Sequence, residues 1–111
     1  MDTANKDGAG QTTEYIRYAL TAHAPDALIA AYREAGRHLA ASPECLGYDL
    51  AQCADDANSF ILRIHWTSID AHMNGFRRGP QFRPFLGAIQ PFIPEIAEMR
   101  HYRSTATEWV R

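Results

Sequence analysis

The sequence predicts an α+β fold in which a four-stranded antiparallel sheet carries its helices on one face. Three observations support this prediction. Strand-like and helix-like hydrophobic periodicities follow one another in the order β-α-β-β-α-β, and the 111 residues suffice for one domain with a core of its own. A short polar turn, "ADDAN", joins the two middle strands and favours an antiparallel hairpin. The complete order is that of the split-βαβ, ferredoxin-like arrangement.

The first predicted strand follows a polar N-terminal segment. Residues 1–13 contain two glycines and almost no large apolar side chain, so we expect a disordered tail there and a single ordered domain over residues 14–111. In "EYIRYALTA" the residues Ile16, Tyr18 and Leu20 alternate with more polar neighbours, as the side chains of a strand do.

Residues 25–41 are predicted to form an amphipathic helix. Proline is accepted at position 25 in the first helical turn, and Asp26 suits the positive end of the helix dipole. Ser42 ends the helix because it precedes a proline. The apolar positions recur with helical spacing, at Leu28, Tyr32, Ala35 and Leu39.

The remaining elements complete the order. "CLGYDLAQC" and "SFILRIHW" are the second and third strands, and "IAEMRHYRST" is the last. Between them we expect a helix in two pieces. The first is capped by Thr67 or Ser68 and weakened at Gly75, and the second runs from Pro80 to just before Pro91. The apolar stripe of the second piece consists of Phe82, Phe85, Leu86 and Ile89.

Composition and charge exclude several classes of function. The chain is 46% hydrophobic and 22% charged with a net charge of −2, which gives no basic footprint for nucleic acid or an anionic membrane. It has no apolar run long enough to cross a bilayer and no secretory signal pattern, so we expect a cytoplasmic protein. Cys45 and Cys53 lie on one predicted strand, roughly 26 Å apart at about 3.3 Å per residue. That exceeds the ~7 Å limit for a disulfide, and we expect two free thiols.

Helices on one face leave the other face of the sheet open. A second copy of the chain covers such a face most simply, across a two-fold axis, so we expect a homodimer. The residues expected on the open face are Tyr15, Arg17, Ile61, Arg63 and His65.

Several stretches resemble a known family. "PECLGYDL" before the hairpin, "WTSIDAH" and "GPQFRPFL" after it, and the closing "EMRHY" are similar to the antibiotic biosynthesis monooxygenase family. The resemblance covers about Glu14 to Tyr102 and implies a dimeric α+β barrel with a pocket between helices and sheet. Some members oxidise aromatic polyketides to quinones with O₂ as co-substrate and no metal, flavin or other cofactor. The resemblance therefore implies a monooxygenase acting on an aromatic or polyketide-like small molecule.

Trp66 and His72 are the predicted catalytic residues. Trp66 shares the parity of Phe60, Leu62 and Ile64 and points toward the helices, either as a core residue or as an aromatic wall with one N–H donor. His72 lies on the apolar stripe of its helix. It is either a hydrogen-bonded packing residue or the base that takes a proton from a phenol or an activated carbon.

Five further residues are candidates for substrate binding. Tyr18 offers a hydroxyl to a ligand or to a backbone partner, and Arg83 offers a cation for an oxyanion or faces solvent. Phe76, Phe82 and Phe85 supply apolar walls. Arg77 and Arg78 are interpreted as a solvated loop, with a carboxylate clamp as the alternative. His101 belongs to a face that the sequence leaves undecided.

Two alternatives to the oxygenase stay open. One is a dimeric small-molecule-binding or stress-response module without oxygenase activity. The other is a haem-binding or haem-degrading relative, which is disfavoured because Ile16 stands where haem degraders have asparagine and "QFRPFLGAI" supplies no axial histidine. The histidine and cysteine spacings predict no metal site, and no phosphate-binding glycine loop occurs.

Overall fold

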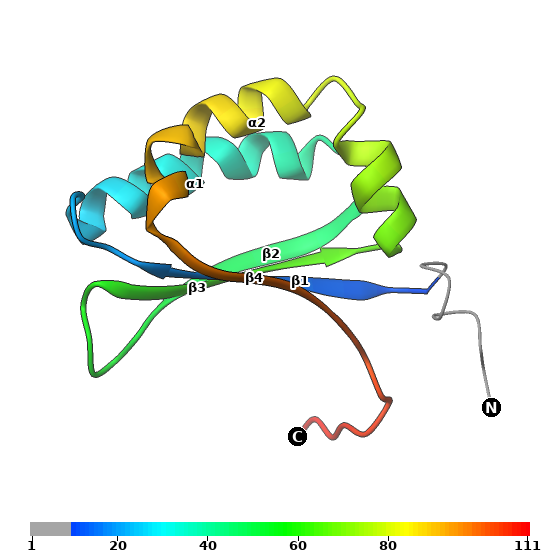
Figure 1. The fold of residues 1–111 in the computed structure, drawn as a ribbon. Helices are drawn as coiled ribbons and strands as arrows, with labels where there is room; N and C mark the ends of the chain where they lie inside the picture. Colours follow the sequence, from blue (N-terminus) through cyan, green and yellow to red (C-terminus); the bar gives the residue numbers. More distant parts are fainter. Residues whose placement is uncertain (1–9) are drawn as a thin grey trace.

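The structure, a computed structural model, describes residues 10–111, which form one antiparallel sheet with helices on one side (Figure 1). The strand order is β2-β3-β1-β4, with every pairing antiparallel, which confirms the ferredoxin-like prediction. The elements are β1 (Thr12–Ala19), α1 (Pro25–Ala40), β2 (Cys45–Gln52), β3 (Ser59–Trp66), the π-helical η2 (Ala71–Phe76), α2 (Phe82–Ile89), the 3-10 helix η3 (Gln90–Glu95) and β4 (Ile96–Arg103).

The first strand departs from the predicted bounds at both ends. It begins at Thr12, two residues before the first residue expected to be ordered, and residues 1–9 of the expected tail lie outside the described residues. It ends at Ala19 rather than at residue 22. The backbone N–H groups of Thr21, Ala22 and His23 donate to the Glu95 carboxylate instead of to a neighbouring strand.

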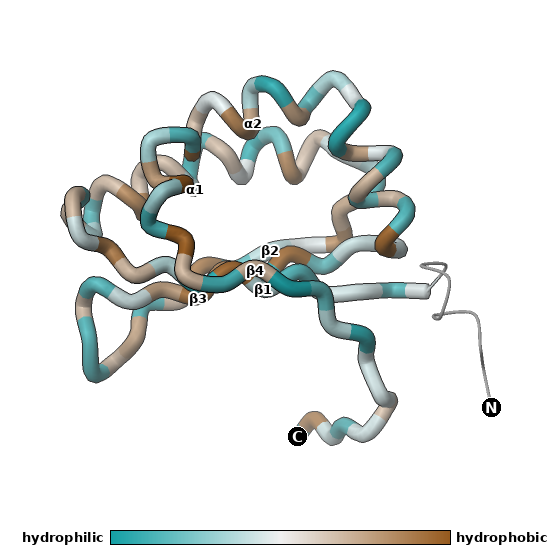
Figure 2. The backbone as a smooth tube through the Cα atoms, viewed as in Figure 1, coloured by the Kyte–Doolittle hydropathy of each residue, from teal (hydrophilic) through white to brown (hydrophobic). Residues whose placement is uncertain are grey.

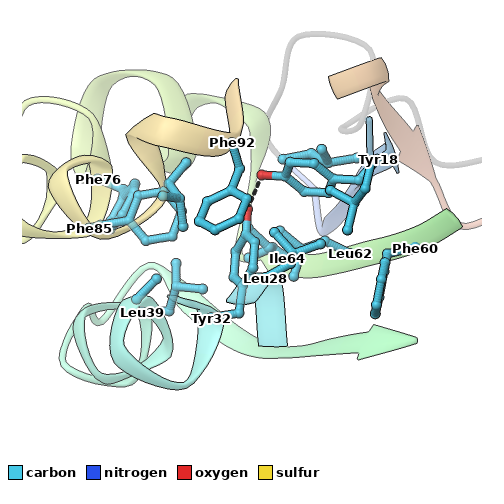
Figure 3. Close-up of a cluster of buried hydrophobic side chains, with 14 of the residues drawn as sticks. Tyr18, Leu28, Tyr32, Leu39, Phe60, Leu62, Ile64, Phe76, Phe85 and Phe92 are labelled. Atoms are coloured by element: carbon cyan, nitrogen blue, oxygen red, sulfur yellow. Dashed lines mark hydrogen bonds between the residues drawn. The ribbon is translucent and has the colours of Figure 1, made fainter. Parts of the chain in front are cut away.

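The core lies between the sheet and α1 and α2. Alternate residues of β1 and β3 point toward the helices, and Leu28, Tyr32 and Leu39 of α1 meet them (Figure 3). Tyr18 and Tyr32 are both buried, and their hydroxyls share a hydrogen bond of 2.5 Å. The predicted stripe of α1 is therefore confirmed as the side that packs on the sheet.

The junction after β3 has an unexpected geometry. Ser68, one of the two expected caps, accepts a hydrogen bond from the Ala71 N–H at 2.8 Å. The chain then widens into a π-helix, in which the Arg77 N–H donates to the carbonyl of His72, five residues earlier, at 3.1 Å. Short π segments recur at functional sites. Here the wide turn holds His72 and Phe76 against Trp66 at the end of β3.

The face of the sheet opposite the helices is open within the described residues. Tyr15 and Tyr102 meet edge to face there with ring centroids 5.1 Å apart, and Arg63 binds the Asp49 carboxylate on β2. The residues after β4 run toward this same side (Figure 1). Polar and apolar segments both occur along the strands, and the β2–β3 turn is largely hydrophilic (Figure 2).

Cys45 and Cys53 are free thiols, as expected.

Candidate active site

A cavity of about 190 Å³ lies between the sheet and the segments η2, α2 and η3. Three of its lining residues, Arg77, Ile93 and Met99, are exposed and mark its opening. Polar groups enter its otherwise apolar wall from Glu14, His72 and Arg77. The full lining consists of Glu14, Ile16, Ile64, Trp66, His72, Phe76, Arg77, Phe82, Phe85, Leu86, Ile89, Ile93, Ile96 and Met99.

Trp66 anchors one end of the cavity. It is the last residue of β3 and is fully buried, with the helix-facing parity that the sequence predicts. Its indole stacks on the imidazole of His72 with ring centroids 4.4 Å apart and an interplanar angle of 6°. Its Nε1–H donates to Oε1 of Glu14 at 3.1 Å. The tryptophan is therefore both an apolar wall and the partner of a buried carboxyl group.

Glu14 is a site residue that our sequence reasoning missed. It lies on β1, is only 4% exposed and stands opposite Ile64 on β3 and His101 on β4. Burial raises the pKa of its carboxyl, while the Trp66 hydrogen bond and the charge of Arg77 act against the rise. A signal was available, because Glu14 shares strand parity with Ile16 and must point toward the helices.

His72 lies between Glu14 and His101 and forms a polar cluster with them. Its side chain is buried, with 4% exposed. Its Nδ1 hydrogen bonds with Nε2 of His101 at 2.8 Å, and its Nε2 lies 3.5 Å from Oε1 of Glu14. Burial lowers the pKa of His72 to about 3, and the positive charges of His101 and Arg77 add to the effect. His72 is thus a neutral imidazole at physiological pH.

His101 connects this cluster to the surface. It lies on β4 and is half-buried, and its contact with His72 shows that it faces the helices, which the sequence left undecided. Burial lowers its pKa, and the charge of Arg77 lowers it further. The sequence offered no signal beyond the parity that it shares with Met99.

The structure brings most of the predicted binding residues together. Phe76 lies at their centre, with its ring centroid 4.9 Å from that of Trp66, 5.3 Å from that of Phe85 and 5.8 Å from that of Phe82. All four rings line the cavity. They form an aromatic box into which a flat, apolar ligand can stack.

Tyr18 and Arg83 lie elsewhere. Tyr18 is 0% exposed, its hydroxyl is taken by Tyr32, and it is not among the lining residues. Arg83 is exposed and also does not line the cavity. The cation at the cavity is Arg77, whose guanidinium lies 5.7 Å from the centre of the Phe82 ring. Arg77 directly follows the π-helix η2, which the sequence did not predict, and this position places it at the cavity.

Residues 10–111 contain no group of three or more histidine, cysteine or acidic side chains placed to hold a metal ion. In the same residues, no helix has the length and apolar character needed to cross a membrane. Chemically, the site combines an aromatic box with a neutral imidazole, a buried carboxyl and a nearby cation. Such a set can bind a flat molecule, accept a proton from it and favour the resulting anion.

Comparisons with known proteins agree with this architecture. The family model described as antibiotic biosynthesis monooxygenase matches residues 13–88. The chain is 18% identical over 73 residues to the Bacillus subtilis protein YczJ, covering 66% of this chain and 77% of that protein.

Solved structures share the fold at low sequence identity. SnoaB, a cofactor-independent oxygenase from Streptomyces nogalater, superimposes with a TM-score of 0.68 at 22% identity, covering 90% of this chain and 100% of that chain. A Bordetella bronchiseptica protein assigned to the same family gives a TM-score of 0.72 at 18% identity, with 86% and 98% covered.

Proposed function

We propose, since this chain belongs to the antibiotic biosynthesis monooxygenase family, that it oxidises a small aromatic or polyketide-like molecule with O₂ and without a cofactor. The observation that carries the proposal is the Glu14–Trp66–His72 cluster on the wall of an otherwise apolar cavity. The likeness to SnoaB supports the cofactor-independent form of the reaction. A cytoplasmic location is part of the same proposal and rests on the sequence.

The cavity favours a compact, flat substrate. Its volume of about 190 Å³ is below the ~300–1,000 Å³ of pockets that hold drug-sized ligands. Phe76, Phe82, Phe85 and Trp66 offer ring faces and edges for stacking. A substrate of a few fused rings, bound with its acidic carbon or hydroxyl toward His72, uses both the walls and the polar cluster.

In the proposed reaction, neutral His72 accepts the acidic proton of the substrate. The resulting carbanion transfers one electron to O₂, and the two radicals combine to form a carbon–oxygen bond. The peroxide takes the proton back from His72. Loss of a second proton from the same carbon then breaks the oxygen–oxygen bond, so that one oxygen atom stays as a carbonyl and the other leaves as water.

Two neighbours support this proton transfer. The Glu14 carboxylate, 3.5 Å from Nε2 of His72, stabilises the imidazolium that forms transiently. Arg77 at the cavity opening favours the anionic intermediate through its positive charge. Tyr18 and Arg83, which the sequence suggested for binding, have no part in this scheme.

The proposal includes a homodimer formed through the open face of the sheet. Ile61 and Tyr102 are large side chains exposed on that face, which also carries the Arg63–Asp49 ion pair. A two-fold copy buries these groups against themselves. The partner also covers the side toward which the C-terminal residues run (Figure 1).

A second candidate function is a binding module without oxygenase activity. It is favoured by the small cavity and by the fact that every buried side-chain polar atom in residues 10–111 already has a hydrogen-bond partner. In such a module His72 would hold the wall together and exchange no proton with the ligand.

Oxygen uptake by chelator-treated protein, with anthrone as the model substrate, separates the two functions. We expect quinone formation that falls at least tenfold in His72→Ala, because the proton acceptor is lost. Trp66→Phe removes the Glu14 hydrogen bond but keeps a ring, and we expect a smaller loss of about 3- to 10-fold.

The controls are matched variants outside the cavity. His38→Ala removes a half-buried histidine that hydrogen bonds with Gln81, and Trp109→Phe removes the exposed tryptophan. Both are expected to retain wild-type uptake. Uptake equal in wild type and His72→Ala would overturn the assignment of the base. Anthrone binding, seen as quenching of Trp66 fluorescence in Trp109→Phe, without any oxygen uptake would favour the binding module.

A further inference from the structure

We infer that His101 is a positioning residue that selects the tautomer of His72 and thereby decides whether Nε2 of His72 presents a lone pair to the cavity. The catalytic consequence rests on the function proposed above. The selection of the tautomer itself does not, and it can be measured without any substrate.

The inference begins with the contact between the two imidazoles. Nδ1 of His72 and Nε2 of His101 are 2.8 Å apart, a normal hydrogen-bond distance, and the ring centroids are 5.0 Å apart. One nitrogen of the pair must carry the hydrogen and the other must be bare. The location of this single hydrogen therefore couples the protonation patterns of both rings.

Neutral His101 permits the productive arrangement. When its Nε2 is bare, Nδ1–H of His72 donates to it. His72 is itself neutral, so its Nε2 then carries no hydrogen and can accept a proton from a ligand. The partner of a histidine commonly fixes its tautomer in this way in metal sites and catalytic triads.

Charged His101 forces the opposite arrangement. Both of its nitrogens then carry hydrogens, so its Nε2–H must donate to Nδ1 of His72. Neutral His72 has to place its own hydrogen on Nε2, where Oε1 of Glu14 lies 3.5 Å away and attracts it. Nε2 then has no lone pair for a substrate proton. Protonation of His101 thus switches the base off without protonating His72.

The surroundings of His101 set the pH at which this happens. The charged and titratable groups that face it are His72 and Arg77 from η2 and its end, Glu14 directly opposite on β1, and Arg103 two residues further along the same face of β4. Burial and the Arg77 charge both oppose a positive charge on His101, so its pKa lies below the ordinary value of 6.5. Neutral His101 lifts the constraint that its protonation imposes, so we expect the productive tautomer at neutral pH and its loss as the pH falls.

Exposure makes the mechanism accessible to solvent protons. His101 is half-buried, whereas His72 and Glu14 are each 4% exposed. Protons from solvent therefore reach His101 far more easily than they reach the base.

Side-chain ¹⁵N NMR of histidine-labelled protein tests the inference directly, with His72→Gln used to assign the His72 signals. At neutral pH we expect His72 to carry its hydrogen on Nδ1 and to have a bare Nε2. As the pH falls, the hydrogen should move to Nε2 with the same midpoint as the titration of His101, while the His72 ring stays neutral. In His101→Ala this exchange should disappear.

The matched control is His65→Gln, which alters a half-buried histidine that hydrogen bonds with Thr13 on the open face. It should leave the exchange unchanged. A His72 tautomer that stays fixed while His101 titrates would overturn the inference, as would a bare Nδ1 at neutral pH.

Oxygen uptake by the same proteins carries the test to function. In wild type, the fall of kcat/KM at acid pH should follow the titration of His101. The amide of His101→Gln can still accept a hydrogen bond from Nδ1–H of His72. This variant should keep its neutral-pH activity within about threefold and should no longer show the fall at acid pH. A fall at acid pH that is unchanged in His101→Gln would overturn the catalytic consequence. If the NMR exchange is present but wild type consumes no O₂, the inference stands and the proposed function fails.

Discussion

Tyr18 of β1 and Tyr32 of α1 form a buried pair of hydroxyl groups in the core. Tyr18 points toward the helices as predicted, but its hydroxyl is paired with that of Tyr32 from α1 (Figure 3). Burial, more than any other cause, raises the pKa of Tyr18 to about 12. Both hydroxyls therefore stay protonated and satisfy each other inside the core.

We predict that Tyr18→Phe destabilises the fold but spares the site. It leaves the Tyr32 hydroxyl without its partner, which costs about 1–3 kcal/mol of unfolding free energy. Urea unfolding measures this cost, and anthrone turnover should stay within about twofold of wild type. The double variant Tyr18→Phe/Tyr32→Phe should cost less than the sum of the two single variants, because no orphan hydroxyl remains. Normal stability with a large rise in KM would instead show that Tyr18 takes part in substrate binding.

The residues of the candidate site differ in how well the sequence predicts them. Strand parity identified Trp66 as helix-facing, and helical spacing did the same for Phe82 and Phe85. Strand parity also places Glu14 on the side that faces the helices. Glu14 was nevertheless missed, because a carboxyl group in a strand suggests solvent exposure unless its hydrogen-bond partner is known. That partner, the Trp66 indole, is 52 residues away in sequence. Contacts of this kind depend on strand register, which no local pattern encodes.

At the scale of elements, Glu95 ties η3 to the connection between β1 and α1. Its carboxylate accepts hydrogen bonds from the N–H groups of Thr21, Ala22 and His23 at 2.8, 2.8 and 3.2 Å and also binds the His23 side chain. The bond from Ala22 contributes most to lowering the pKa of Glu95 to about 2, and the His23 side chain is next. This clamp fixes the segment that joins the cavity wall to β4.

We predict that Glu95→Gln lowers stability in a pH-dependent manner. The folded-state pKa of about 2 is below the ordinary value of 4.5, so the carboxylate stabilises the fold fully above pH 4.5. That contribution is lost as the pH falls from 4.5 toward 2. Urea midpoints of wild type and variant should therefore converge over this range. Glu98→Gln, on an exposed ion pair with Arg100, should show little difference throughout. A gap between wild type and Glu95→Gln that persists at pH 2 would contradict the clamp.

Element boundaries followed from the sequence where a local signal exists. Pro25 starts α1 as predicted, and Ser68, one of the two expected caps, caps the segment after β3. The α-helix α2 ends before Pro91 as predicted, but it begins at Phe82 rather than at Pro80, and the 3-10 helix η3 continues through Pro91. The π-helix η2 was not predictable, because it depends on the packing of His72 and Phe76 against Trp66 rather than on the preference of any residue for that conformation. It is also the feature that brings Arg77 to the cavity.

At the scale of the whole molecule, periodicity and chain length were enough to predict the sheet and its one-sided helical layer. Because the helices cover only one side of the sheet, the other face is left open, and this open face bears most on how the protein assembles. It presents Ile61 at 39% and Tyr102 at 47% exposure. Each strand also contributes a charged residue to this face, namely Arg17, Asp49, Arg63 and Arg100. A mixed face of this kind suits a two-fold contact in which the same patch meets itself.

We predict that Ile61→Glu converts the protein to a monomer. Arg17 lies opposite Ile61 on β1, but the dimer would still bury a new carboxylate from each copy in place of an apolar side chain, and the desolvation penalty raises the dimer dissociation constant by about 100-fold or more. Sedimentation velocity should show wild type at twice the mass of the chain and the variant at the single mass. Arg33→Glu, on the exposed side of α1, should sediment as wild type. A monomeric wild type would contradict the dimer.

Cofactor-independent monooxygenation in this cavity can be followed directly with ¹⁸O₂. Chelator-treated protein is incubated with anthrone under ¹⁸O₂, and the quinone and water are analysed by mass spectrometry. We expect one labelled atom in the new carbonyl and the other in water, at a rate at least tenfold lower in His72→Ala. Labelling no faster than in the absence of protein, although Trp66 fluorescence shows that anthrone binds, would contradict the proposed function.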